Sequence, residues 1–159
     1  MAPADGSLYD DDFYAWTQYQ AKVLRTLRTR DNRFDRDNVA EEIETVGRNE
    51  RDAVRSEVRR ILEHFLKLEH SPATEPRSDW MVSIANARAE LEEKLTATLR
   101  QDVETVLPRV YARAKDVGEV ALLKYGEGNA VTRFPATCPY TLDQILAIGW
   151  YPEPAEERK

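Results

Sequence analysis

Apolar side chains recur at three- and four-residue spacing from Asp37 to Leu68, and this pattern predicts one long amphipathic helix. At about 100° per residue these side chains lie within roughly 60° of one mean direction. They are Val39, Ile43, Val46, Val54, Val58, Ile61, Phe65 and Leu68. Such a stripe must be buried against other elements. No stretch of the chain alternates with period two over a useful length, so we expect those elements to be helices rather than strands.

Three titratable residues share the apolar sector of this helix. Glu50, Glu57 and His64 fall seven residues apart, and Gln20 points inward from the preceding predicted helix. A buried carboxylate needs a partner or a raised pKa. The four residues therefore predict either a buried polar network, which is the interpretation we favour, or a site. If Glu50 lines a cleft, it is the best candidate for a general acid or base.

The spacing of these residues argues against a metal centre. Residues seven apart on a helix are separated by about 10.5 Å along its axis, whereas zinc ligands converge to about 2.0–2.3 Å from the ion. The Glu-x-x-His pair of di-iron bundles is absent, because Ile61 precedes His64 by three residues and Lys67 precedes His70. We expect no dedicated metal site and no cofactor.

Three further amphipathic segments complete the predicted fold. One precedes the long helix and follows the acidic run Asp10–Asp12. The other two come after the long helix: the earlier is capped by Ser78, and the later is interrupted by Pro108, which predicts a kink or a break. Gly47 in the long helix predicts either the close approach of another helix or a bend. The predicted fold is an all-α bundle of four main helices. Its inward positions include Phe13, Trp16, Trp80, Ile84, Ala87, Leu91, Leu95, Val103, Val110, Ala114, Val117 and Tyr125.

The ends of the chain differ from its middle. We expect residues 1–159 to form one helical domain, with a disordered lead at 1–8 and a flexible tail at 153–159. Residues 134–152 predict an extended strap that packs on the bundle, in which Thr141 and Gln144 form a capping box for a short helix. Trp150 is expected to pack in this strap, although an exposed aromatic end could instead bind a partner.

Charge and cysteine content limit the partners of the chain. It carries 23 Lys+Arg against 29 Asp+Glu, a net charge of −6, which argues against broad duplex DNA binding. Arg48, Arg51, Arg55 and Arg59 form a candidate basic face, which we interpret as solvated and partly paired. The one cysteine, Cys138, cannot form an intramolecular disulfide, and no secretory signal or membrane span is apparent. We expect a cytoplasmic protein.

Four blocks of sequence resemble the bacterial family named domain of unknown function 29. They are residues 8–16, 37–50, 64–67 and 134–142. The resemblance implies a small helical protein of the kind found mostly in cyanobacteria and proteobacteria. It implies no established activity, cofactor or catalytic residue.

Two hypotheses of function remain open. The first is a cytoplasmic helical interaction or regulatory module without catalysis, which has a protein partner or forms a homo-oligomer and does not act on membranes or nucleic acid. It rests on the acidic composition and the missing catalytic motifs. The alternative is a small enzyme or metal-binding helical protein that uses Glu50 together with Glu44, Arg51 or His64.

Overall fold

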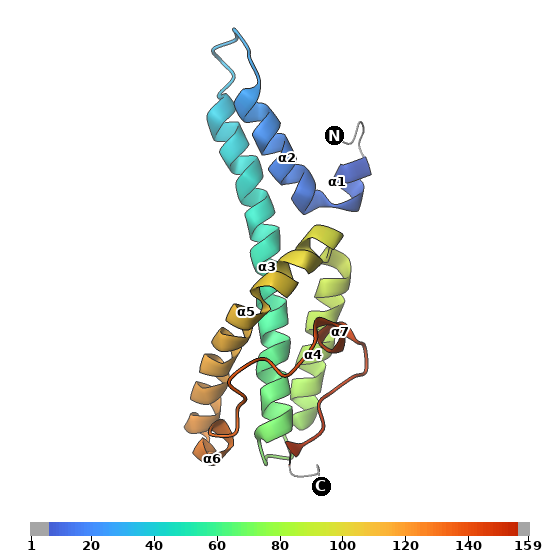
Figure 1. Cartoon of the computed structure of the whole chain (residues 1–159), viewed down its shortest axis with the longest axis vertical. Helices are drawn as coiled ribbons and strands as arrows, with labels where there is room; N and C mark the ends of the chain where they lie inside the picture. The colour runs from blue at the N-terminus through green and yellow to red at the C-terminus, as the bar shows by residue number, and fades with distance from the viewer. Residues whose placement is uncertain (1–6, 156–159) are drawn as a thin grey trace. The chain divides into compact units, whose positions relative to one another are not determined.

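The computed structural model describes residues 7–155, which form an all-α fold without a strand (Figure 1). Four helices are long: α2 (Phe13–Thr26), α3 (Arg36–His70), α4 (Arg77–Lys94) and α5 (Ala97–Lys124). Three are short: α1 (Ser7–Asp11), α6 (Gly128–Val131) and α7 (Leu142–Leu146). The predicted fold class and the four main helices are confirmed. Ser7 and Leu8, which the sequence analysis placed in a disordered lead, begin α1, whereas residues 1–6 and 156–159 lie outside the described part of the chain.

The contacts of the chain group into two compact units, which we describe separately. The N-terminal unit contains the residues up to 54 together with 94–102, and the C-terminal unit contains 55–93 and the residues from 103 onward. Both α3 and α5 contribute residues to each unit.

In the N-terminal unit, α2 is fixed by its N-cap residue and by a close contact with α3. The carboxylate of Asp12 caps α2 by accepting a hydrogen bond from the Ala15 amide at 3.0 Å, and it also accepts one from the Thr98 amide at 3.1 Å. A Cβ atom at Gly47 would lie 2.0 Å from Thr17 Oγ1. Of the two predictions for Gly47, the close approach of another helix is therefore the correct one.

The start of α3 and two of its predicted inward residues differ from the prediction. The helix begins at Arg36 rather than Asp37, and the Asn38 amide donates to the Asp35 carboxylate, which caps the helix. Val39 and Val46 remain 37 % and 45 % exposed. The buried positions are Ala40 and Gly47, each one residue later, because a close helix contact selects small residues.

The C-terminal unit has a core drawn from α3, α4 and α5, which lie side by side in Figure 1. Leu66 of α3 lies within contact distance of Gly118 of α5, and Lys67 of α3 lies over the Trp80 ring of α4. The predicted inward residues that are buried in this unit are Val58, Ile61, Phe65, Leu68, Ile84, Ala87, Leu91, Val103, Val110 and Ala114.

Other predictions for α4 and α5 need correction. Helix α4 begins at Arg77 and ends at Lys94, so Ser78 does not cap it and Leu95 follows it. Helix α5 continues through Pro108, so of the predicted kink or break at this residue the break is wrong. Val117 and Tyr125, expected to face inward, are 44 % and 74 % exposed. The inward line of α5 runs instead through Tyr111, Gly118 and Leu122, where Gly118 lies against the Phe134 ring.

The C-terminal strap, residues 134–152, crosses this core. The capping box predicted for α7 is present: the Gln144 amide donates to Thr141 Oγ1 at 3.1 Å, and the Thr141 amide donates to Gln144 Oε1 at 3.0 Å. Trp150 packs edge-to-face on Phe65 with ring centroids 5.3 Å apart. The strap thus buries aromatic side chains on α3.

Candidate functional site

The predicted polar residues of the long helix are half-buried rather than sealed in a core. Gln20 and Glu50 belong to the N-terminal unit, and no hydrogen bond joins them. Glu57 and His64 belong to the C-terminal unit, and none joins these two either among the described residues. Glu57 instead pairs with Arg60 at 3.2 Å. The structure therefore gives Glu50 no catalytic partner among these residues.

His64 has a strongly perturbed titration. Burial, reinforced by the nearby Lys67 and Arg60, lowers the pKa of His64 to about 4. Its Nδ1 atom is buried and accepts no hydrogen bond from any described residue. The imidazole is neutral at pH 7, so it behaves as a packing residue at the edge of the core.

Three of the four arginines of the candidate basic face form ion pairs with acidic side chains. Arg48 pairs with Glu41 at 2.7 Å, Arg51 with Asp52 at 3.0 Å and Arg59 with Glu63 at 3.2 Å. Arg55, the fourth member, is half-buried. Exposed pairs of this kind contribute little stability, and they reduce the positive charge offered to an anion.

Arg88 of α4 holds the strap from beneath. Its side chain is almost fully buried, and it donates from Nε to the Ile145 carbonyl at 2.9 Å and from Nη2 to the carbonyls of Gln144 at 3.1 Å and Trp150 at 2.8 Å. The guanidinium carbon lies 5.6 Å from the centre of the Phe65 ring. Burial lowers the pKa of Arg88, but arginine stays charged at any working pH.

A second polar contact holds the strap at the end of α3. The buried Tyr140 hydroxyl donates to the buried carboxylate of Glu69, and His70 Nε2 lies 3.9 Å from the same carboxylate. Burial raises the pKa of Tyr140, so the hydroxyl keeps its proton. Nearby, Tyr111 donates to the Pro135 carbonyl at 2.7 Å. The Tyr140 hydroxyl of the strap thus donates to α3, and the Tyr111 hydroxyl of α5 donates to the strap.

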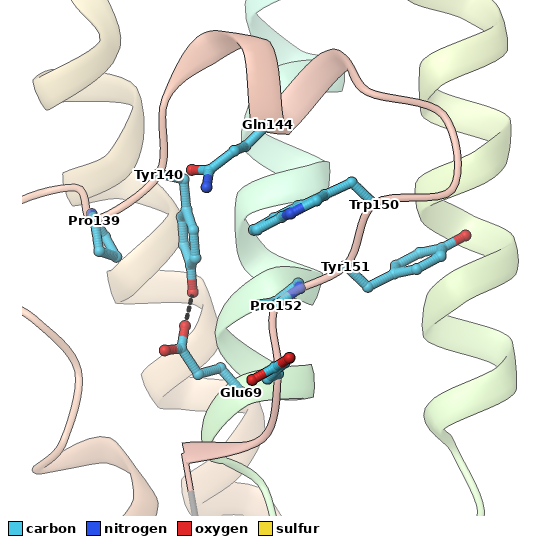
Figure 2. A pocket seen from close by; sticks show the side chains of 8 residues that line it. Glu69, Pro139, Tyr140, Gln144, Trp150, Tyr151 and Pro152 are labelled. Carbon is cyan, nitrogen blue, oxygen red and sulfur yellow. Dashed lines mark hydrogen bonds between the residues drawn. The ribbon is translucent and has the colours of Figure 1, made fainter. Parts of the chain in front are cut away.

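A pocket of about 370 Å³ opens beside the Glu69–Tyr140 contact. Figure 2 shows the rings of Tyr140 and Trp150 around it, with the Gln144 amide above them and the Glu69 carboxylate below the Tyr140 hydroxyl. We call this the strap pocket. Its lining residues are Glu69, Pro139, Tyr140, Gln144, Trp150, Tyr151, Pro152 and Glu153.

A different surface feature lies at the C-terminal end of α5. Val117, Val120, Leu123 and Tyr125 are 44 %, 69 %, 58 % and 74 % exposed. We call these four residues the α5 patch. Single exposed apolar residues are ordinary, whereas four within nine positions at one helix end form a candidate interaction surface.

The sequence contained signals for the residues that hold the strap. Arg88 lies four positions after Ile84 and three before Leu91, and Glu69 lies four after Phe65, so each falls on a buried helical line. Arg and Glu are usually exposed, and for that reason these positions were not predicted as inward.

Neither a metal cluster nor a membrane helix is found in the described residues. Across 7–155, no group of three or more His, Cys, Asp or Glu side chains could hold a metal ion. None of the described helices is both long and apolar enough to cross a membrane.

Comparison with known proteins places the fold but no activity. A family model described as "Domain of unknown function DUF29" matches residues 8–151. A crystal structure of an alpha-helical protein of unknown function from Rhodospirillum rubrum ATCC 11170 is similar, with a TM-score of 0.78 and 23 % identity over 89 % of this chain and 90 % of that one. No curated protein matches the chain.

Proposed function

The chain belongs to the DUF29 family, whose description assigns no function, and we propose that this member is a cytoplasmic helical interaction module without catalysis. It acts through protein contacts made by the α5 patch. The observation that carries the proposal is the exposure of four apolar side chains at one helix end. Burial raises the pKa of the half-buried Cys138 thiol, which disfavours the reactive thiolate and is consistent with a role without thiol catalysis.

The order of residues in the α5 patch fits a second copy of the same helix. Val117 and Leu123 lie three residues before and after Val120, and Asp116 and Lys124 lie four before and after it. In an antiparallel pair centred on Val120, each residue lies opposite the residue that is equally far from Val120 in the other direction along the other copy. Asp116 then meets Lys124, and Val117 meets Leu123, at both ends of the contact. This self-complementary pattern is what a two-fold interface requires.

Both charged residues of this pattern are available for such a contact. Asp116 and Lys124 are exposed in the described structure, and the Lys124 ammonium lies 5.9 Å from the centre of the Tyr125 ring. Val120 is the most exposed of the three aliphatic side chains in the patch. The geometry gives the interface an apolar centre and an ion pair on each side.

Sedimentation equilibrium of the purified chain tests the proposal. We expect a reversible dimer that Val120→Asp abolishes, while Val82→Asp on α4, a matched change at a 57 % exposed valine, leaves it unchanged. Circular dichroism checks that both variants fold.

A charge exchange separates self-association from a general apolar effect. Lys124→Asp places two acidic residues opposite each other and weakens the dimer, whereas the double change Asp116→Lys with Lys124→Asp restores it. A wild-type chain that stays monomeric up to about 1 mM, where even a contact worth about 4 kcal/mol would form, overturns the choice of a second copy as partner. Equal behaviour of Val120→Asp and Val82→Asp overturns the role of the α5 patch.

A further inference from the structure

The N-terminal unit contains a helical hairpin whose apolar side chains are only partly covered. It is formed by α2 and by α3 as far as Val54. The two helices run antiparallel, because Thr17 lies against Gly47, whereas Arg25, which comes later in α2, pairs with Glu41, which comes earlier in α3. Beside this contact four apolar side chains are 37–45 % exposed, namely Val23, Leu27, Val39 and Val46.

These side chains lie on one side of the hairpin. In each helix they belong to a stripe at the positions one before and three, six and ten after a buried residue, which is Thr17 in α2 and Ala40 in α3. Such positions are offset from the buried residue by about 60–120° in the same rotational sense. Because the helices run antiparallel, the same sense of rotation places both stripes on one face. We call this the hairpin face, and its members are Trp16, Gln20, Val23, Leu27, Val39, Ile43, Val46 and Glu50.

The loop end of the hairpin face is positively charged. Arg28 and Arg30 are exposed, and neither forms an ion pair with another described residue. The acidic side chains of this end already have partners there, which are Arg33 for Asp31 at 2.7 Å, the Asn38 amide for Asp35 and Arg36 for Asp37 at 3.0 Å. The charge of Arg28 and Arg30 is therefore left for a group outside the hairpin.

The opposite end of the hairpin face is acidic. The ring of Tyr9 in α1 packs on Trp16 with centroids 4.8 Å apart, and the neighbouring Asp10 and Asp11 are exposed. Glu50 closes the α3 stripe at this end and is half-buried. None of these three carboxylates forms an ion pair within the described part of the chain. A carboxylate on a partly buried apolar face favours a cation in whatever covers that face.

We propose that the hairpin face binds one amphipathic helix of a partner protein, acidic at its N-terminal end and basic at its C-terminal end. The acidic end lies at Arg28 and Arg30, the basic end lies at Glu50, and apolar residues at three- and four-residue spacing cover the valines between them. This direction follows from the helix dipole, which stabilises acidic residues in the first turn of a helix and basic residues in the last. The bound helix then runs parallel to α3. Since α2 has 14 residues, a partner helix of about 14 residues, or about 21 Å, covers the face.

The opposite charges of the two ends favour this partner over others. An anionic membrane or a nucleic acid would be attracted by Arg28 and Arg30 but repelled by the acidic end. A second copy of the chain fits the charges less simply. Copies already pair through the α5 patch in the function proposed above, and a second self-contact would extend that assembly beyond a closed dimer.

Fluorescence anisotropy of a labelled synthetic peptide tests the proposal with the full chain. The peptide has about 18 residues, with leucines at three- and four-residue spacing, glutamates at the polar positions of its first half and lysines at those of its second half. A second peptide has the glutamates and lysines exchanged. We expect the first peptide to bind the wild-type chain about tenfold more tightly than the second, because only the first matches the charges of both ends.

Variants locate the binding on the hairpin face. Val46→Asp should weaken binding of the first peptide about tenfold or more, whereas Val82→Asp on α4, at a valine that is 57 % exposed, should leave it unchanged. Arg28→Glu should weaken it about three- to fivefold. The matched control is Lys22→Glu, an exposed cation offset by about 140° from Thr17 in the other rotational sense, which should change it less than twofold. A chain with both Arg28→Glu and Glu50→Lys should prefer the second peptide. Circular dichroism checks that each variant folds.

Four results would overturn the inference. The first is no binding of either peptide at about 1 mM protein, and the second is equal binding of both peptides by the wild-type chain. The third is self-association of the Val120→Asp chain that Val46→Asp removes, which would make a second copy the occupant. The fourth is binding of phosphatidylglycerol vesicles that Val46→Asp and Arg28→Glu both weaken. The anisotropy measurement reports peptide binding and not the oligomeric state, so this inference and the dimer of the α5 patch can fail separately.

Discussion

Replacement of Arg88 by methionine should release the C-terminal strap. Methionine keeps the length and much of the apolar packing of the side chain but removes three hydrogen bonds of 2.8–3.1 Å to the carbonyls of residues 144, 145 and 150. Hydrogen bonds from a charged donor contribute about 1.5–3 kcal/mol each, and the lost desolvation cost of the guanidinium offsets part of the sum. We expect a net loss of about 3–5 kcal/mol.

The size of this loss follows from the acceptors that remain. Replacing a buried ion pair by apolar residues is often neutral because both charges leave together. Here only the donor leaves, and three backbone carbonyls stay in place, which must open to water or remain unsatisfied. The stability of Arg88→Lys should lie between that of the wild type and that of Arg88→Met. An ammonium keeps the charge but does not present the planar fork that bridges separate carbonyls.

Urea unfolding and amide hydrogen exchange measure the effect at two scales. A loss of about 3–5 kcal/mol lowers Tm by about 6–20 °C for a chain of this size. The Trp150 amide, which donates to the Ala147 carbonyl at 3.1 Å, should exchange about a hundredfold faster or more, ahead of the amides in the middle of α3.

A matched control defines what refutes the reasoning. Arg30→Met, at an exposed arginine of the loop between α2 and α3, should change stability by no more than about 0.5 kcal/mol. If Arg88→Met costs as little as this and leaves Trp150 exchange unchanged, the three hydrogen bonds do not hold the strap.

Two further predictions concern single positions of α3. Gly47→Ala should destabilise the N-terminal unit by about 1–3 kcal/mol despite the better helix propensity of alanine, because its Cβ would lie 2.0 Å from Thr17 Oγ1. Adding Thr17→Ala to the same chain should recover part of this loss in urea unfolding. A single Gly47→Ala variant that is more stable than the wild type would contradict the close contact. His64, with its pKa lowered to about 4 from an unfolded value near 6.5, contributes stability that is fully present above pH 6.5 and is lost as the pH falls to 4, because the unfolded chain binds the proton first. His64→Gln should therefore reduce the fall in unfolding free energy between pH 7 and pH 4 by about 1–2 kcal/mol, after allowance for its partial exposure, and an unchanged fall would show that His64 is not desolvated.

The sequence predicted the helices well because their signals are local. Apolar spacing located all four long helices, and the pair Thr141 and Gln144 located α7, since a capping box lies within four residues of chain. The buried face of each helix was harder to predict. The valines at 39, 46 and 117 are apolar but partly exposed, because a helix buries the side that its neighbour covers, and periodicity alone does not identify that neighbour.

The candidate site was missed for a related reason. Reasoning from one helix selected Glu50, because it falls within the apolar sector of that helix, as the functional carboxylate. The carboxylate buried beneath the strap is Glu69, whose partner Tyr140 follows 71 residues later. A contact across that separation leaves no local pattern, and only the packing of the strap brings its two members together.

The strap that lines the pocket is held by polar contacts at two places. Arg88 of α4 donates hydrogen bonds to the carbonyls of Gln144 and Trp150, and Glu69 of α3 accepts a hydrogen bond from the Tyr140 hydroxyl. Trp150 and Tyr140, which form the pocket walls, are therefore positioned by the same contacts that stabilise the fold. Any ligand that binds in the strap pocket is bound by the packed strap alone, so by linkage it must favour that packed state. Structural polar residues and a binding role are consequently not alternatives at this position, because the residues that fix the strap also line the pocket.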